Sequence, residues 1–164
     1  MNVSTIVQCC AYSVGQAAQP ILSVNYGAGN WARIKGTLRY SLYTVLFFSV
    51  VWTISVWAVP NGFIRVFMAP TESVCRIAPS IMRSYGISFL LLPLNVFSTY
   101  YFQSVMKPGA SFLVSVARGM VISGILIYAL PALAGAEFIW FAMPITELLV
   151  AFAVIILMIR YTSK

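Results

Sequence analysis

Five long apolar stretches constrain this chain more than any other feature of its sequence. They cover residues 3–26, 38–59, 79–106, 112–133 and 138–159. A helix needs roughly 20 residues to cross about 30 Å of hydrocarbon, and each stretch reaches that length. Hydrophobic residues make up 61% of the chain and charged residues only 8%, which is too little charge to cover a water-facing surface. The sequence therefore predicts an all-α integral membrane protein with a bundle of five transmembrane helices.

Short segments rich in glycine, proline or asparagine separate the apolar stretches. They lie at 27–30 (GAGN), 60–62 (PNG), 107–109 (KPG) and 134–136 (AGA). Glycine ends helices readily, and proline cannot continue a helix that precedes it. We expect the first, third and fourth of these segments to be tight turns that join antiparallel neighbours.

Cations gather after the first stretch, around the third break and after the last stretch, which alternate correctly for one side of the membrane. These residues are Arg33, Lys35, Arg39, Lys107, Arg118, Arg160 and Lys164. Because cytoplasmic loops carry an excess of Lys and Arg, this pattern predicts an outside N-terminus and a cytoplasmic C-terminus. The formal net charge of +7 thus reports topology and does not predict a nucleic-acid partner. We expect Arg118, which lies inside a stretch, to snorkel towards the cytoplasmic surface.

Polar side chains occur near the middle of three stretches, at Gln16, Asn95 and Glu147. Gln19 lies three residues after Gln16 and so shares its face on a helix. A carboxylate at the centre of a bilayer costs about 2.5 kcal/mol or more, so Glu147 should face the bundle interior, a water-filled cavity or a polar partner. Glu147 is then either a group that exchanges a proton for a cation or a protonated side chain that holds two helices together.

Three prolines lie near these polar residues, at Pro20, Pro93 and Pro144. A proline inside a membrane helix bends it and frees a backbone carbonyl. The freed carbonyls would add to a polar zone at the middle of the bundle, although each proline could also serve only to bend its helix.

Little in the sequence predicts enzymatic chemistry or a bound cofactor. The chain has no histidine, and its three cysteines form no metal-binding or redox pair. It also has no glycine-rich phosphate loop with a Walker-type lysine. We therefore expect no enzyme activity, no cofactor and no metal, and any transport would use a gradient and not nucleotide bound to this chain.

Three segments together resemble one known family. Residues 15–35, GQAAQPILSVNYGAGNWARIK, resemble the signature that ends the second helix of each lobe in the multidrug and toxic compound extrusion (MATE) transporters. Residues 100–119, YYFQSVMKPGASFLVSVARG, resemble the junction of that family's tenth and eleventh helices. Residues 139–149, IWFAMPITELL, resemble its twelfth helix.

This resemblance implies that the chain is a fragment of a twelve-helix transporter, namely helices eight to twelve of a partial C-terminal lobe. Such transporters lie in the plasma or inner membrane and export amphipathic or cationic small molecules in exchange for Na⁺ or H⁺ by alternating access. By similarity, Gln16, Gln19, Asn95 and Glu147 would line the cavity, and the missing N-terminal lobe would be the main partner besides the lipid bilayer. Some branches of the family carry an acidic residue in the tenth helix, but residues 85–101 contain none.

Two other functions compete with multidrug efflux. A lipid-linked saccharide flippase of the same superfamily would need cations in its cavity for the pyrophosphate, and Arg83 is the nearest candidate. A non-transporting membrane assembly subunit would use the glutamines and prolines for helix packing alone.

Overall fold

The computed structural model describes residues 2–67 and 72–162, and its regular elements are all helical. The elements are α1 (Asn2–Gly27), α2 (Trp31–Ala58), α3 (Pro60–Phe67), α4 (Glu72–Gly86), η1 (Ile87–Leu90), α5 (Leu92–Ser104), α6 (Pro108–Val116), η2 (Ala117–Ile122), α7 (Ser123–Ala134), η3 (Ala136–Phe141) and α8 (Ala142–Thr162). Of these, η1 and η3 are 3₁₀ turns and η2 is a π-helical turn. The predicted all-α fold is therefore confirmed.

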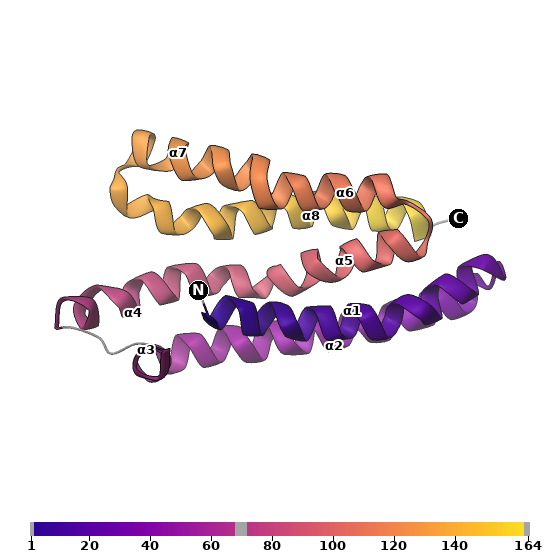
Figure 1. Ribbon diagram of the computed structural model, residues 1–164, viewed down its shortest axis with the longest axis horizontal. Helices are drawn as coiled ribbons and strands as arrows, with labels where there is room; N and C mark the ends of the chain where they lie inside the picture. Colours follow the sequence, from indigo (N-terminus) through magenta and orange to yellow (C-terminus); the bar gives the residue numbers. More distant parts are fainter. Residues whose placement is uncertain (1, 68–71, 163–164) are drawn as a thin grey trace.

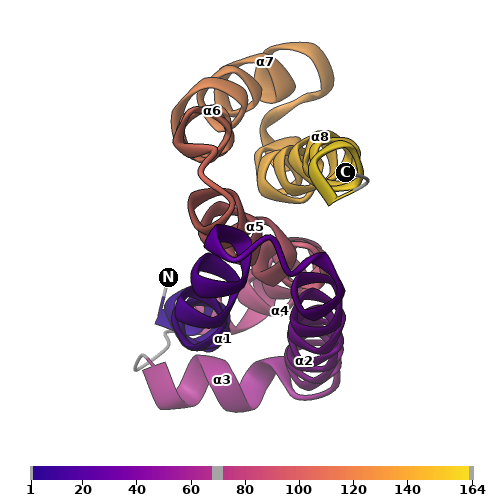
Figure 2. The same ribbon diagram turned by 90° about the vertical axis from the view of Figure 1, so that its right-hand side faces the viewer.

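The long helices run side by side along one axis (Figure 1). In the end view, α1, α2 and the α4–α5 helix form one group, and α6–α7 forms a second group with α8 (Figure 2). The short helix α3 lies across the end of the first group (Figure 2). The α1–α2 turn, the α5–α6 turn and the C-terminal end of α8 share the right-hand end of Figure 1. Most of the clustered cations therefore lie at one end of the bundle; Lys164 lies outside the described residues.

Among the described residues, four helical runs are long and apolar enough to cross a membrane. They are Trp31–Ala58, Arg76–Ser104, Pro108–Ala134 and Ala136–Thr162. The first predicted stretch also forms one continuous helix, α1, of 26 residues. That helix spans roughly 39 Å at 1.5 Å per residue, but its glutamines, asparagines and serines keep its hydropathy below that of the other four.

The predicted breaks end and begin helices as expected. Gly29 has a φ of +68°, and the Asn30 side chain accepts a hydrogen bond from the Arg33 backbone N–H at 3.2 Å, which caps α2. Pro108 begins α6, and Gly135 has a φ of +106° between α7 and η3. Since only glycine adopts such positive φ values without steric cost, these turns follow directly from the sequence.

Two of the three predicted proline bends coincide with irregular backbone. Pro93 and Pro144 lack the N–H that would bond the carbonyl four residues earlier, and these carbonyls belong to Phe89 in η1 and Trp140 in η3. By contrast, α1 remains α-helical through Pro20. At the third predicted stretch, the helix α4 starts at Glu72 and passes through Pro79.

The apolar core centres on α5. One cluster joins α1, α2, α5, α6 and α8, and its largest members are Phe97, Tyr101 and Phe102 of α5. A second cluster joins α1 and α2 to η1 and α5 through Val7, Val56 and Leu92, among others. Large apolar side chains remain exposed on the outer helices: Phe112, Leu113, Ile125, Tyr128, Phe152 and Ile156. A bundle with an apolar exterior of this kind is suited to hydrocarbon, in agreement with a membrane protein.

Candidate functional site

Glu147 lies on α8, and its side chain is 0% exposed. Its carboxylate accepts two hydrogen bonds, one from Arg118 Nε to Oε1 at 2.8 Å and one from Asn95 Nδ2 to Oε2 at 2.6 Å. Because both oxygens accept donors, this is the geometry of an ionised carboxylate. Three helical runs thus meet at one buried charge. We call Asn95, Arg118 and Glu147 the polar cluster.

Asn95 holds Glu147 at two points. Besides the side-chain bond, its amide nitrogen donates to the Glu147 backbone carbonyl at 2.9 Å. The Asn95 side chain is fully buried, and its Oδ1 has no hydrogen-bond partner among the described residues. Such an unsatisfied buried oxygen is costly, because the oxygen has lost water without gaining a donor. The cluster therefore retains one free acceptor next to a carboxylate.

Arg118 lies in the π-helical turn η2, between α6 and α7. Ten residues, or roughly 15 Å of helix, separate it from the start of α6 at Pro108. At that depth, an unpaired guanidinium would be expensive, and the ion pair with Glu147 compensates for it. The prediction that Arg118 snorkels to the cytoplasmic surface was wrong, because a buried carboxylate lies within its reach.

The two predicted glutamines lie apart from this cluster. The Gln16 side chain is exposed, because Val7, Ala11, Gly15, Ala18 and Leu22 form the buried face of α1. Gln19 is half-buried, and its backbone carbonyl accepts a hydrogen bond from Ser104 Oγ at 3.4 Å. Among the described residues, no hydrogen bond links either glutamine to Asn95 or Glu147. The structure brings together Asn95 and Glu147 but not Gln16 and Gln19.

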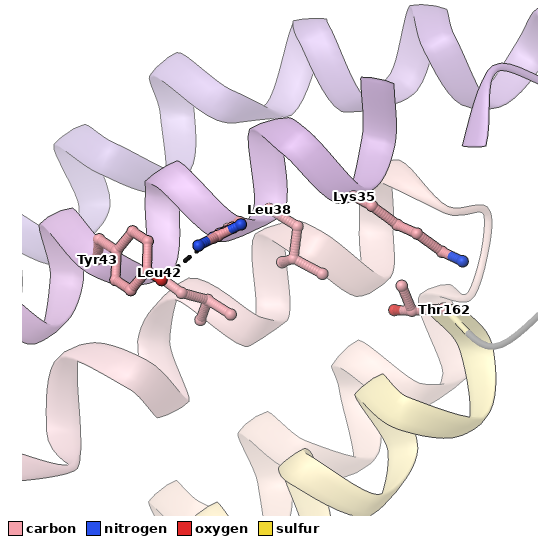
Figure 3. A pocket seen from close by; sticks show the side chains of 6 residues that line it. Lys35, Leu38, Leu42, Tyr43 and Thr162 are labelled. Atoms are coloured by element: carbon pink, nitrogen blue, oxygen red, sulfur yellow. Dashed lines mark hydrogen bonds between the residues drawn. The ribbon is translucent and has the colours of Figure 1, made fainter. Parts of the chain in front are cut away.

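A separate shallow crevice of about 260 Å³ opens at the cationic end of the bundle, between α2 and α8. Lys35, Leu38 and Leu42 line it from α2, and Thr162 lines it from the end of α8 (Figure 3). Arg39 donates from Nε to the Tyr43 hydroxyl at 3.1 Å and lies over that ring at 5.5 Å from its centroid. None of the four predicted cavity residues lines this crevice.

A family model described as MatE matches residues 1–129 of the chain. The chain belongs to the MatE family. No curated protein and no solved structure matched it. The resemblance predicted from the three sequence segments is confirmed at the level of the family.

MatE proteins are transporters, so this chain is a membrane transport protein and not a member of an enzyme family. The matched MatE region includes Asn95 and Arg118 and ends before Glu147. The buried charge pair therefore joins the matched part of the chain to its last helix.

Sequence reasoning missed Arg118 as a site residue, although two signals pointed to it. Glu147 needed a partner at its own depth, and Arg118 is a cation well inside an apolar stretch. The chain contains only three acidic residues, and Glu137, the other one with a described side chain, is exposed. Matching charges by their depth in the membrane therefore indicates Arg118 as a partner for Glu147, but it does not fix how the two helices are rotated towards each other.

Proposed function

We propose that this MatE protein exports amphipathic or cationic small molecules in exchange for Na⁺ or H⁺, with Glu147 as the group that binds the cation. The observation that carries the proposal is the fully buried, doubly hydrogen-bonded carboxylate of Glu147 at membrane depth. A buried carboxylate requires a positive partner, which can be a protein cation, a metal cation, a proton or a cationic guest. Such a group can hold one kind of cation on one side of the membrane and another kind on the other.

The proposed transport uses alternating access. The chain would form part of the C-terminal lobe, and the N-terminal lobe would supply the facing half of the cavity. Gln16 supports this arrangement, because its polar side chain is exposed on a helix that otherwise packs by apolar contacts. In this proposal the protein lies in the plasma or inner membrane, with the cationic end of the bundle in the cytoplasm.

A saccharide flippase is less well supported by the charges inside the bundle. Pyrophosphate recognition needs cations that are free to bind an anion, whereas Arg118 is already neutralised by Glu147. The other candidate cation, Arg83, is exposed, and its backbone carbonyl accepts the Trp57 indole N–H at 3.1 Å. The buried charges balance, which favours exchange of cations over binding of a polyanion.

The proposal is tested with Glu147→Gln in cells that express the transporter, using ethidium efflux as the measurement. We expect efflux, normalised to the protein level in the membrane, to be lost, because glutamine preserves the shape but cannot carry the negative charge. The matched control is Glu137→Gln, which neutralises an exposed carboxylate in η3 and should leave efflux intact. Normal efflux by Glu147→Gln would overturn the proposal and leave Glu147 as a residue that only packs helices.

A further inference from the structure

We infer that Arg118 is an internal cation that occupies Glu147 whenever no transported cation is bound, so that each incoming cation must displace its guanidinium. This inference rests on the proposed function, and it assigns a role to a residue that the transport proposal leaves out. The geometry behind it is the 2.8 Å ion pair between a fully buried carboxylate and a guanidinium whose side chain is 19% exposed.

The charges of the polar cluster allow only one cation at a time. Arginine keeps its positive charge at any physiological pH, so Arg118 cannot make room by losing a proton. If Glu147 binds a proton, Na⁺ or an organic ammonium group, the Arg118 charge loses its partner in a low-dielectric site. The two states in which the charges balance are Arg118 paired with Glu147, and Arg118 withdrawn towards water with another cation on Glu147.

The two partners of Glu147 differ in how firmly they are held. Asn95 is fully buried and binds both the carboxylate and the backbone carbonyl of Glu147. Arg118 makes one bond to the carboxylate and is the only member of the polar cluster that reaches the surface of the molecule. Asn95 therefore fixes the position of the carboxylate, and Arg118 is the partner that can leave.

The backbone around Arg118 fits this movement. Arg118 lies in the π-helical turn η2, followed directly by Gly119, and a Cβ built on Gly119 would meet nothing within 4 Å. π-helical turns interrupt the regular hydrogen-bond ladder of a helix and occur often at functional sites. Long cationic side chains can also swing along a helix towards water while their methylene groups stay on apolar surface. Because Glu147 carries one negative charge, the ligands that compete with Arg118 for it are monovalent cations and protons, and not anions.

The experiment compares Arg118→Gln with the wild-type transporter reconstituted in proteoliposomes, with tetraphenylphosphonium as the transported cation. Without its internal competitor, Glu147 should bind the cation more tightly, so the apparent KM should fall about tenfold, the size of one charge-assisted hydrogen bond. The maximal rate should fall as well, because no guanidinium remains to replace the cation as it leaves. Arg118→Lys keeps the positive charge and should retain a KM close to that of the wild type. Arg83→Gln, which removes an exposed cation, should change neither quantity.

The outcomes separate this inference from the proposed function. If Glu147→Gln abolishes transport while Arg118→Gln leaves KM unchanged or raises it, the cation site stands and the displacement by Arg118 is refuted. If Glu147→Gln transports normally, the proposed function itself fails. A second measurement covers the case in which Arg118→Gln does not fold. Infrared difference spectra of protein with ¹⁵N-labelled arginine should show a guanidinium change when tetraphenylphosphonium binds, and Arg118→Lys should lack it. An identical spectrum for the wild type and Arg118→Lys would also refute the inference.

Discussion

Helix α5 packs against α1 and against α8, and these two helix–helix contacts, which we call seams, differ in their chemistry. Where α1 packs on α5, the contact is mainly apolar, apart from the Ser104–Gln19 hydrogen bond, and very close: a Cβ added to Gly15 would lie 2.5 Å from Tyr100 Cδ2. Where α5 packs on α8, a fully buried amide and carboxylate face each other across the contact. Close packing of small residues against larger ones stabilises membrane helices without any charge. The α1–α5 seam therefore has one good arrangement, whereas under the proposed function the α5–α8 seam would depend on which cation balances Glu147.

This difference divides the bundle into a part that stays together and a part that can respond to a cation. The second apolar cluster lies entirely within the group of α1, α2 and α4–α5, whereas the larger cluster also includes residues of α6 and α8. The group of α6–α7 and α8 contributes Arg118 and Glu147, which are the charged members of the polar cluster. Under the proposed function, cation binding would thus change the Arg118–Glu147 contact within the second group of Figure 2 and the Asn95–Glu147 contact between the two groups.

The largest expected effect comes from breaking the ion pair on one side only. Arg118→Met should lower the free energy of unfolding by about 3 kcal/mol, because it leaves the buried Glu147 charge without its cation. The double variant Arg118→Met, Glu147→Met should lose much less, since two flexible apolar side chains can fill the site. The wild type, Arg118→Met, Glu147→Met and the double variant form a double-mutant cycle. Thermal unfolding in detergent, followed by intrinsic tryptophan fluorescence, measures the stability of each. Additive losses in the double variant would contradict the view that the polar seam serves function more than stability.

Much of this arrangement could be predicted from the sequence. The turns follow from local chemistry, because Gly29 and Gly135 adopt backbone angles that other residues avoid. The meeting of Asn95 with Glu147 follows from depth, because each residue lies near the middle of an apolar stretch and needs a polar partner. The residue types and their positions within the apolar stretches were sufficient to predict these features.

The remaining features depend on how each helix is rotated about its axis, which depth does not determine. Gln16 and Gln19 lie at a suitable depth, but the face of α1 that packs is set by Gly15 against Tyr100, which leaves the Gln16 side chain exposed. Arg118 reaches Glu147 from a π-helical turn, and a regular 3.6-residue period does not predict where such a turn occurs. The sequence thus predicted the depth of the site better than it predicted which residues form the site.

A smaller effect is expected when the apolar seam is disturbed. Gly15→Ala should lower the free energy of unfolding by about 2 kcal/mol, because the new methyl group would overlap the Tyr100 ring and force α1 away from α5. The control is Gly124→Ala in α7, where a Cβ would meet nothing within 4 Å. That change should be neutral or stabilise the helix by about 0.5–1 kcal/mol. Equal melting temperatures for the two variants would show that the α1–α5 seam is less tightly packed than the structure indicates.

The smallest effect concerns a single hydroxyl where α5 meets the end of α8. Tyr101 is buried, and its hydroxyl shares a hydrogen bond with Thr162 Oγ1 in the last turn of α8. Tyr101→Phe keeps the ring in the apolar cluster and removes only this bond, so the expected loss is about 1 kcal/mol. Hydrogen–deuterium exchange should become faster in residues 158–162 and remain unchanged around Gly15. Tyr128→Phe, at a site that is 82% exposed, serves as the control and should alter neither region. Faster exchange throughout α1 in Tyr101→Phe would mean that the two seams are coupled and that the bundle responds as one unit.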